Sequence, residues 1–187
     1  MADEKLDKAF EAVTRAHFMP KEIKHAANID HAMPIGHGQT ISQPTTVRMM
    51  LEWLDPQPGE KILDIGSGSG WTTALLSYLV GPRGRIYAVE RVPDLVDFGR
   101  DNAERYGVKN ARFHQSGEEL GLPEEAPFNR ILVSATADEL PHELVGQLKT
   151  GGKLVIPVHN DILEITKKSK DDLDIVKHPG FVFVPLL

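Results

Sequence analysis

The sequence contains no cysteine. Disulfide bonds, thiolate metal sites and cysteine nucleophiles are therefore excluded, and the absence suits a reducing cytoplasm. Long apolar runs are missing as well, since none approaches the roughly 20 residues that a membrane-spanning helix needs. The charged opening MADEKLDKAFEAVTRAHF lacks the apolar core of a secretion signal. We expect a soluble, cytoplasmic protein with no membrane partner.

Basic residues are in the minority, with 21 Lys and Arg against 27 Asp and Glu, and the net charge is −6. A broad nucleic-acid-binding face needs clustered basic side chains, so we expect no nucleic-acid partner. The chain has 187 residues, of which 41% are hydrophobic. This length supports one domain with a sizeable core but not two comfortable ones. We expect a single domain that acts as a monomer.

The first third of the chain, residues 1–58, is expected to hold two helices and an irregular segment between them. The first helix should end before Pro20, and the second should begin at Pro44, which suits a first helical turn. The stripe of the first helix consists of Leu6, Phe10, Val13 and His17. The buried stripe of the second helix consists of Val47, Met50, Leu51 and Leu54.

From residue 59 onward, apolar strands alternate with helical segments. The expected strands are 61–65, 85–90, 111–115, 129–135 and 153–158. The expected helices are 71–80, 93–106 and 139–149, the last ended by Gly151 and Gly152. This alternation predicts an α/β fold in which helices cover both faces of a mostly parallel sheet. After residue 158 the pattern indicates antiparallel strands at one edge, from the segments DILEITKK, LDIVKH and FVFVPLL.

A glycine-rich loop, 64-DIGSGSG-70, follows the first of these strands and precedes a helix. Glycine lets the backbone turn sharply and lets a ligand approach where a Cβ would block it. Glu90 ends the next strand, 20 residues beyond Gly70, and an acidic side chain there can accept both hydroxyls of a ribose. A tight turn without a ligand is the alternative.

The spacing of this loop bears on which nucleoside it binds. Dinucleotide loops usually read G-x-G-x-x-G, whereas this one reads G-x-G-x-G with Asp64 directly before it. A carboxylate repels a pyrophosphate but attracts an ammonium or a sulfonium. S-adenosylmethionine carries both cations and no phosphate, so we favour it over NAD, and a dehydrogenase is the weakest option.

Several segments together resemble the protein-L-isoaspartate (D-aspartate) O-methyltransferases. They are, in chain order, PIGHGQTISQP, LDIGSGSGW, AVER, EEAPFNRILVSA, QLKTGGKLVIPV and FVPL. The first is the most specific, whereas the glycine loop is shared with methyltransferases generally. The resemblance implies a class I, Rossmann-like methyltransferase fold whose seven-stranded sheet has an antiparallel C-terminal strand.

The same resemblance implies an activity. S-adenosylmethionine would donate its methyl group to the free carboxylate of L-isoaspartyl (and D-aspartyl) residues in damaged proteins, which begins their repair and leaves S-adenosylhomocysteine. Ser42, in TISQP, is the residue that the family links to activity. The expected domain plan is N-terminal helices and a substrate lid over 1–58, a cofactor-binding core over 59–158, and antiparallel strands over 159–187.

The chain departs from the family pattern in three places. Asn28 replaces an aromatic residue before Asp30, Ser116 replaces an acid that meets the adenine, and the run 134-SAT-136 replaces Thr-Ala-Ala. These departures motivate two alternatives. One is a related methyltransferase acting on another protein, a small-molecule carboxylate or RNA; the other is a non-catalytic module that binds S-adenosylmethionine.

The expected site follows from the loop and from the resemblance. Ser42 is the catalytic candidate, hydrogen-bonding rather than attacking, although it could instead cap the following helix. The expected cofactor-binding residues are Thr40, Gln43, Asp64, Gly66, Ser67, Gly68, Gly70, Glu90, Arg91, Gly117 and Glu118. The expected substrate-binding residues are Asp30, Ile35, Gly36, Thr40 and Ser42.

Other residues have plainer alternatives. Asp30 could form a local Asx-turn, Glu118 could be a solvated loop charge, and Trp71 should pack beside the cofactor. No metal is expected, because the six-residue spacing of His25, His31 and His37 fits no common metal motif.

Overall fold

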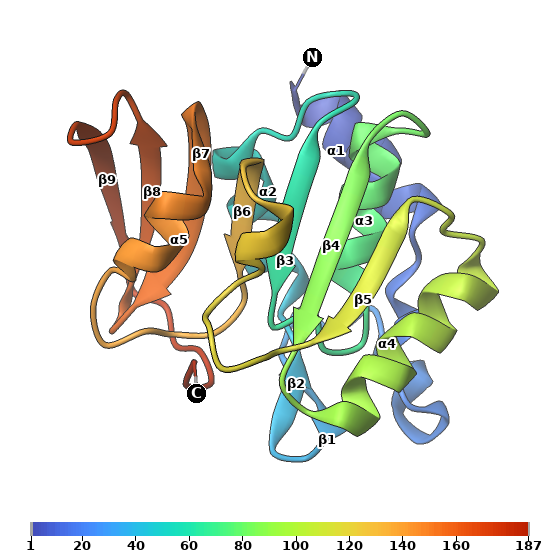
Figure 1. Cartoon of the computed structure of the whole chain (residues 1–187). Helices are drawn as coiled ribbons and strands as arrows, with labels where there is room; N and C mark the ends of the chain where they lie inside the picture. The colour runs from blue at the N-terminus through green and yellow to red at the C-terminus, as the bar shows by residue number, and fades with distance from the viewer. Residues whose placement is uncertain (1, 187) are drawn as a thin grey trace.

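The computed structural model describes residues 2–186 and is organised around one seven-stranded sheet with helices on both faces (Figure 1). Its strands are β3 (Lys61–Ile65), β4 (Arg85–Glu90), β5 (Ala111–Gln115), β6 (Phe128–Val133), β7 (Leu148–Val158), β8 (Asp161–Lys167) and β9 (Leu173–Pro179). A separate hairpin consists of β1 (Met33–Gly36) and β2 (Gln39–Ile41). The α-helices are α1 (Ala2–Ala12), α2 (Pro44–Leu54), α3 (Trp71–Val80), α4 (Pro93–Tyr106) and α5 (His142–Gln147). The 3₁₀ helices are η1 (Arg15–Phe18), η2 (Lys21–Ala26) and η3 (Pro123–Glu125).

The strand order in the sheet is β5-β4-β3-β6-β7-β8-β9. Strands β3 to β7 run parallel, β8 pairs antiparallel with β7, and β9 pairs antiparallel with β8. The chain moves outward from β3 to β5 and then returns to place β6 on the other side of β3. The carboxyl ends of β3 and β6 therefore flank the point where the winding direction reverses, which is where open α/β sheets bind ligands.

Two apolar clusters explain why this sheet is covered on both faces. Along β3 the buried side chains alternate: Ile62 belongs to the cluster under α1, α2, α3 and α4, and Leu63 to the cluster under α5. Figure 1 shows α5 in front of the sheet and α1 and α3 behind it. Fully buried large side chains such as Phe18 and Phe128 each contribute about 1.5–3 kcal/mol of burial free energy. The predicted mostly parallel α/β architecture is confirmed.

Two predicted helices have different ends. The first was expected to include His17 and to end before Pro20, but α1 ends at Ala12 and Thr14 is extended (φ −67°, ψ 119°) before η1 begins. The helix expected over 139–149 ends at Gln147, because Leu148 pairs with Phe128 of β6 and begins β7. The segment with Gly151 and Gly152 lies inside β7, so the prediction that these glycines end the helix is wrong.

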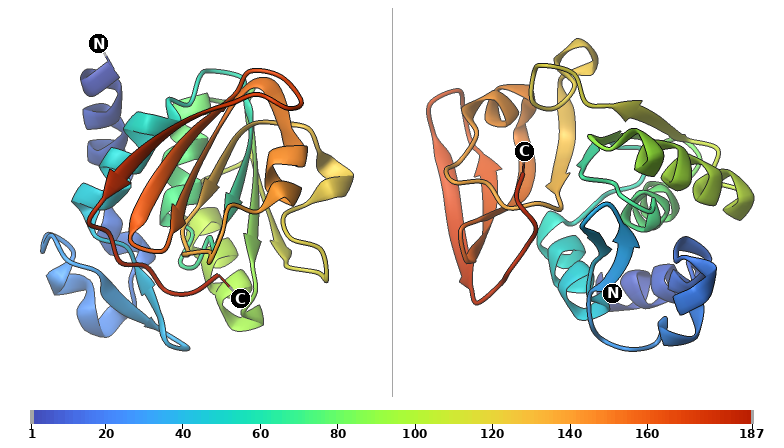
Figure 2. Two further views of the ribbon diagram at one scale, coloured as in Figure 1. Left: turned by 90° about the vertical axis from the view of Figure 1, so that its left-hand side faces the viewer. Right: turned by 90° about the horizontal axis from the view of Figure 1, so that it is seen from below.

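The prediction that FVFVPLL forms a strand is wrong for the residues that the structure describes; Leu187 lies outside them. Residues 181–186 run back beneath the sheet as an irregular segment, as Figure 2 shows. The segment is fixed at Thr136, whose N–H donates to the Val184 carbonyl at 2.8 Å and whose carbonyl accepts from Leu186 N–H at 2.8 Å. Phe181 packs against the apolar cluster under α1 to α4, which favours this path. In residues 2–186 we find no helix with the length and apolar character needed to cross a membrane.

Candidate active site

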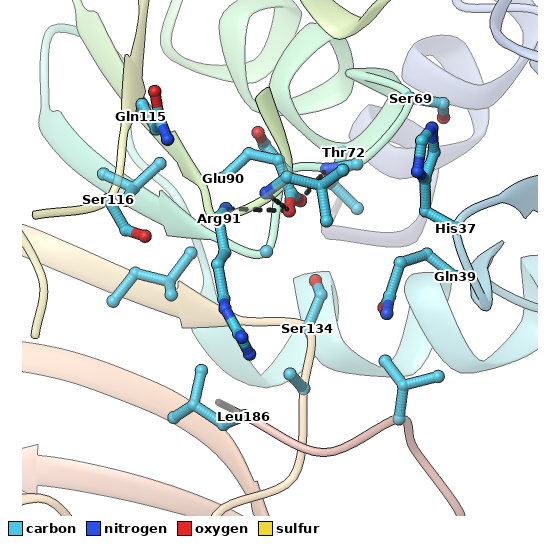
Figure 3. Close-up of a pocket in the computed structure, with 18 of the residues that line it drawn as sticks. His37, Gln39, Ser69, Thr72, Glu90, Arg91, Gln115, Ser116, Ser134 and Leu186 are labelled. Carbon is cyan, nitrogen blue, oxygen red and sulfur yellow. Dashed lines mark hydrogen bonds between the residues drawn. The ribbon is translucent and has the colours of Figure 1, made fainter. Parts of the chain in front are cut away.

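A cavity of about 880 Å³ lies at the carboxyl ends of the parallel strands (Figure 3). The last residues of three strands line it, namely Ile65 of β3, Glu90 of β4 and Gln115 of β5, together with Ser134 directly after β6. Parallel strands end at the same edge of a sheet, so their loops converge here. The hairpin end closes one side with residues 39–42, and the C-terminal segment contributes residues 184–186.

The glycine loop is anchored by its own backbone and by α4. The N–H of Gly66 donates to the Val89 carbonyl at 2.9 Å, and the Asn102 side chain of α4 donates to the Ser69 carbonyl at 3.0 Å. Gly70 has φ +83°, and a Cβ there would lie 2.7 Å from the Gly99 carbonyl oxygen. The loop therefore needs glycine at this position both for its backbone conformation and for the close approach of α4.

Glu90 receives three backbone hydrogen bonds. Its Oε2 accepts from the N–H of Gly68 at 2.9 Å, and its Oε1 accepts from the N–H groups of Arg91 at 2.8 Å and Val92 at 3.0 Å. Glu90 is 7% exposed and lines the cavity, and the dashed lines in Figure 3 mark hydrogen bonds of its carboxylate. These bonds fix the carboxylate beside the loop, and its remaining acceptor capacity suits a ligand with hydroxyl donors.

Asp64 lies beneath the loop and does not line the cavity. Its Oδ2 accepts from Thr72 at 3.0 Å and from Thr73 at 2.6 Å, and its Oδ1 is buried without a partner in the described structure. Burial raises the pKa of Asp64 to about 6, opposed by the bonds from Thr73 and Thr72 and reinforced by the charge of Glu90. A cation near the cavity floor would stabilise the ionised form.

The opposite wall is the β1–β2 hairpin and the residues that follow it. His37 takes a positive φ of 54° at its turn, and its Nε2 lies 3.3 Å from an Asp94 carboxylate oxygen. Ile35 is buried and its Cδ1 lies 3.2 Å from where a Cβ on Gly68 would be, so the hairpin rests on the glycine loop. Ser42 lines the cavity, and its hydroxyl has no hydrogen bond within residues 2–186.

Asp30, rather than Ser42, caps α2. Its Oδ1 accepts from the Thr45 N–H at 2.9 Å, and its Oδ2 accepts from the Thr45 hydroxyl at 2.7 Å and from Gln43 Nε2 at 3.0 Å. These bonds hold the pKa of Asp30 below its ordinary value, with the backbone N–H of Thr45 the largest cause. The alternative role of Ser42 as a helix cap is therefore not seen, and neither is an Asx-turn at Asp30.

The predicted site residues divide into two groups. Those that line the cavity are Thr40, Ser42, Gly66, Ser67, Gly68, Glu90, Arg91, Gly117 and Glu118. Those that support its walls without lining it are Asp30, Ile35, Gly36, Gln43, Asp64 and Gly70. Glu118 is exposed as well as cavity-lining. Trp71 packs edge-on against Phe10 and also lines the cavity.

The cavity has many lining residues that were not among the predicted site residues. Examples are Gln39, Ser69, Thr72, Ser134 and the C-terminal residues 184–186. Ser69 and Thr72 were recoverable, because they flank the last glycine of the loop. Ser134 was recoverable as well, because it directly follows β6. Residues 184–186 were not, because only the fold of the C-terminal segment beside Thr136 brings them to the cavity. Within residues 2–186, no group of three or more His, Asp or Glu side chains could hold a metal ion.

The residues present fit S-adenosylmethionine. A buried, unpartnered acceptor at Asp64 Oδ1 and a second unpartnered polar atom at Ser67 Oγ lie at the glycine loop. An amino-acid ammonium and carboxylate need such groups, while Glu90 presents a fixed carboxylate to a ribose. No basic side chain positioned for a pyrophosphate occurs in the loop itself.

Comparison with known proteins gives a consistent assignment. The family model described as Protein-L-isoaspartate(D-aspartate) O-methyltransferase (PCMT) matches residues 1–187. A protein-L-isoaspartate O-methyltransferase of Pyrococcus horikoshii is 42% identical over 98% of this chain and 85% of its own length. One of Aeropyrum pernix is 45% identical over 96% of this chain and 71% of its own length.

A solved structure agrees with the architecture. A protein-L-isoaspartate O-methyltransferase from Plasmodium falciparum, crystallised with S-adenosyl-L-homocysteine, superposes with a TM-score of 0.88 at 30% identity. The match covers all of this chain and 92% of that one. The fold is thus of the class I methyltransferase type, as expected from the sequence.

Proposed function

Because this chain belongs to the family of protein-L-isoaspartate (D-aspartate) O-methyltransferases, we propose that it methylates the free carboxylate of isoaspartyl residues in damaged proteins. S-adenosylmethionine is the methyl donor, supplying a methyl group activated on a cationic sulfonium. The protein substrate is a chain that carries an isoaspartyl residue, and the reaction begins its repair.

One observation carries this proposal. A single cavity is bounded on one side by the glycine loop and Glu90, and on the other by the end of the hairpin with Ser42. The first side fits a nucleoside, and the second presents a free hydroxyl close to it. Donor and acceptor can therefore meet in one place, which a module that only binds S-adenosylmethionine does not require.

In the proposed reaction, the main task of the protein is to position the acceptor carboxylate against the methyl donor. A carboxylate with a reference pKa of about 4 is ionised at neutral pH, so no general base is needed. An oriented pair of reactants gains several kcal/mol over the same reactants in solution. We assign this orientation to the Ser42 hydroxyl, which donates to the acceptor carboxylate, and to Thr40 beside it. The hairpin also excludes water, which would otherwise stabilise the separated charges.

On the donor side of the cavity, S-adenosylmethionine is proposed to be held by side chains and backbone groups whose positions the fold fixes. Glu90 and the residues at the end of β5, Gly117 and Glu118, would hold the adenosine half, with Arg91 at the rim. Ser67 and Gly68 would approach the amino-acid half through the loop. Asp64 and Gln43 would act from beneath, Asp64 by its charge and Gln43 through its bond to Asp30. Gly70 would act by letting α4 pack against the loop.

A direct assay tests the activity. The protein is incubated with methyl-labelled S-adenosylmethionine and two peptides that differ only in isoaspartate against aspartate at one position. We expect label in the isoaspartyl peptide alone. Label in neither peptide, together with tight cofactor binding by calorimetry, would identify a non-catalytic binding module. Label in both would indicate a broader carboxyl methyltransferase.

The proposal also covers the domain organisation, oligomeric state, location and partners of the protein. We propose one domain organised as 1–58, 59–158 and 159–187, acting as a monomer in the cytoplasm without nucleic-acid or membrane partners. The net charge of −6 supports the absence of a nucleic-acid partner. The cysteine-free composition suits a reducing compartment.

A further inference from the structure

Arg15 lies outside the cavity, yet its side chain reaches the backbone of the residue that faces the acceptor. It comes from η1, is 5% exposed and does not line the cavity. We propose that Arg15 is the positioning residue that holds Ser42 in its place against the donor side of the cavity. This inference rests on the proposed function, because it assigns which residue positions Ser42 in that same site.

The first set of contacts ties Arg15 to the segment before the hairpin. One terminal nitrogen, Nη1, donates to the carbonyl oxygens of Ala27 at 3.2 Å and Ile29 at 3.1 Å. The other, Nη2, donates to the carbonyl oxygen of His31 at 2.7 Å. This segment is neither helix nor strand, and of these three carbonyl groups only that of Ile29 also accepts a backbone hydrogen bond among the described residues, from the N–H of His31 at 2.8 Å, so the guanidinium helps to determine the path of the segment.

The second set reaches the end of the hairpin. Nη2 also donates to the carbonyl oxygens of Ile41 at 3.2 Å and Ser42 at 3.0 Å. The Ser42 hydroxyl has no hydrogen bond of its own in the described structure, so its direction depends on the backbone that carries it. Fixing the Ser42 carbonyl therefore fixes the backbone that carries the hydroxyl and restricts the positions that the hydroxyl can reach.

A third contact joins Arg15 to the donor side. The guanidinium carbon lies 5.5 Å from the ring centroid of Trp71, within the range of a cation–π interaction. Trp71 is the first residue of α3, lines the cavity, and donates from Nε1 to the Val13 carbonyl at 3.2 Å. The Arg15 side chain thus contacts both the first residue of α3 and the backbone of Ser42.

Arginine suits this task because its two terminal nitrogens carry four N–H donors that point in different directions and together reach all five carbonyl oxygens, while the buried Nε has no partner within residues 2–186. A lysine ammonium carries three donors on one atom at the end of a shorter side chain, so it cannot reach all five carbonyl oxygens that Nη1 and Nη2 reach here. Burial lowers the pKa of Arg15 below its ordinary value, and the charge of the Asp30 carboxylate partly opposes this shift.

Arg130 provides a matched control. It is also a partly buried arginine that ties backbone carbonyls, with Nε 2.9 Å from the carbonyl oxygen of Leu54 and Nη1 3.1 Å from Glu60. Leu54 is the last residue of α2, whereas Ser42 lies just before the first. The same Arg→Lys change can therefore be made at the two ends of one helix, near the cavity and far from it.

The kinetic test compares Arg15→Lys with Arg130→Lys. We expect Arg15→Lys to lower kcat/KM for an isoaspartyl peptide about 100-fold, the size of effect that a 1 Å misplacement produces. Calorimetric affinity for S-adenosylmethionine should change by less than about twofold. Arg130→Lys should lower the melting temperature but leave kcat/KM close to that of the unmodified enzyme. Should Arg15→Lys fail to fold, Arg15→Gln, which keeps two donors, takes its place.

A double-mutant cycle separates positioning from general destabilisation. If Arg15 acts through Ser42, then adding Arg15→Lys to Ser42→Ala should cost less than about threefold more, because no hydroxyl remains to be misplaced. Fully additive losses, or an Arg15→Lys variant with unchanged kcat/KM, would overturn the proposal.

Amide hydrogen exchange gives a readout that does not depend on activity. Arg15→Lys should speed exchange across residues 33–43 and leave residues 61–70 unchanged, while Arg130→Lys should leave both unchanged. Inactivity of the unmodified enzyme towards isoaspartyl peptides would contradict the proposed function only. Unchanged exchange across residues 33–43 would contradict the role of Arg15, whichever substrate the enzyme uses.

Discussion

The two walls of the cavity are held in place by different kinds of contact. The donor wall, residues 61–71 with Glu90, belongs to the central sheet and is fixed by backbone bonds between neighbouring strands. The acceptor wall, residues 33–43, is a two-stranded hairpin outside that sheet. It is held by a few long side chains, above all Arg15, together with the buried Ile35.

This difference teaches that the two walls should respond differently to substitution. Changes in the donor wall disturb packing that the whole sheet shares, so they should cost stability. Changes in the acceptor wall disturb orientation with little loss of burial, so they should cost turnover.

A matched pair of glycines tests the contrast in stability. Gly70→Ala should lower the free energy of unfolding by about 2–5 kcal/mol, combining the cost of a positive φ with overpacking against Gly99. Its Cβ would lie 2.7 Å from the Gly99 carbonyl oxygen. Gly38→Ala, at φ +71° with nothing within 4 Å, should cost only about 1–2 kcal/mol. Urea unfolding measures both, and equal losses would contradict the distinction between the walls.

A matched pair of serines tests the contrast in function. Ser42→Ala removes a hydrogen bond to a charged acceptor, worth about 1.5–3 kcal/mol, so kcat/KM should fall roughly 10- to 100-fold. Its affinity for S-adenosylmethionine should stay nearly unchanged. Ser67→Ala, on the donor wall, should instead weaken cofactor binding. Steady-state kinetics and calorimetry on both variants decide the matter, and weaker cofactor binding by Ser42→Ala would remove its assignment to the acceptor side.

The buried carboxyl of Asp64 gives the donor wall a pH dependence. Its pKa of about 6 means that the ionised form, which attracts a cationic ligand, is lost as pH falls below that value. Cofactor affinity should weaken roughly tenfold between pH 7.5 and pH 5, and Asp64→Asn should flatten this profile. Calorimetry across that range measures it.

The same group has the opposite effect on the ligand-free protein. Since the folded pKa of Asp64 lies above its ordinary value, its contribution to stability is present below about pH 4 and is lost as pH rises through about 6. A cofactor affinity that does not change with pH would show that the donor's cations lie away from Asp64.

The smallest effect is expected at Asp30, which is exposed and bonds to the start of α2. Asp30→Asn keeps an acceptor for the Thr45 N–H but removes the charge, so the melting temperature should fall only slightly. The lowered pKa of Asp30 means that the contribution of its charge is present above its ordinary pKa and is lost in more acidic solution. Thermal melts at neutral and acidic pH measure it, and a large loss of activity with no change in melting would instead indicate a substrate contact.

The local pattern of residues determined most of the helices and strands and the nucleoside-binding side of the cavity. The glycine loop between β3 and α3, the acid ending β4 and the apolar runs of the parallel strands are contiguous signals, and all were predictable. The helix α2 was also predictable, from Pro44 to its buried stripe. Each of these depends on hydrogen bonds and burial among residues close in the chain or in neighbouring strands.

Only the tertiary structure decided where some segments end, which path the C-terminal segment takes and which residues Arg15 contacts. Three features involve partners distant in the sequence. The Val13 carbonyl, just after α1, accepts from Trp71, residues 181–186 bond to Thr136, and Asp30 caps α2. Arg15 gave no signal in the sequence, because its five carbonyl partners become neighbours only after the hairpin has folded onto the glycine loop. A pattern of residue types specifies which segments are strands and helices, but the direction of a buried guanidinium is set by where the other segments come to lie.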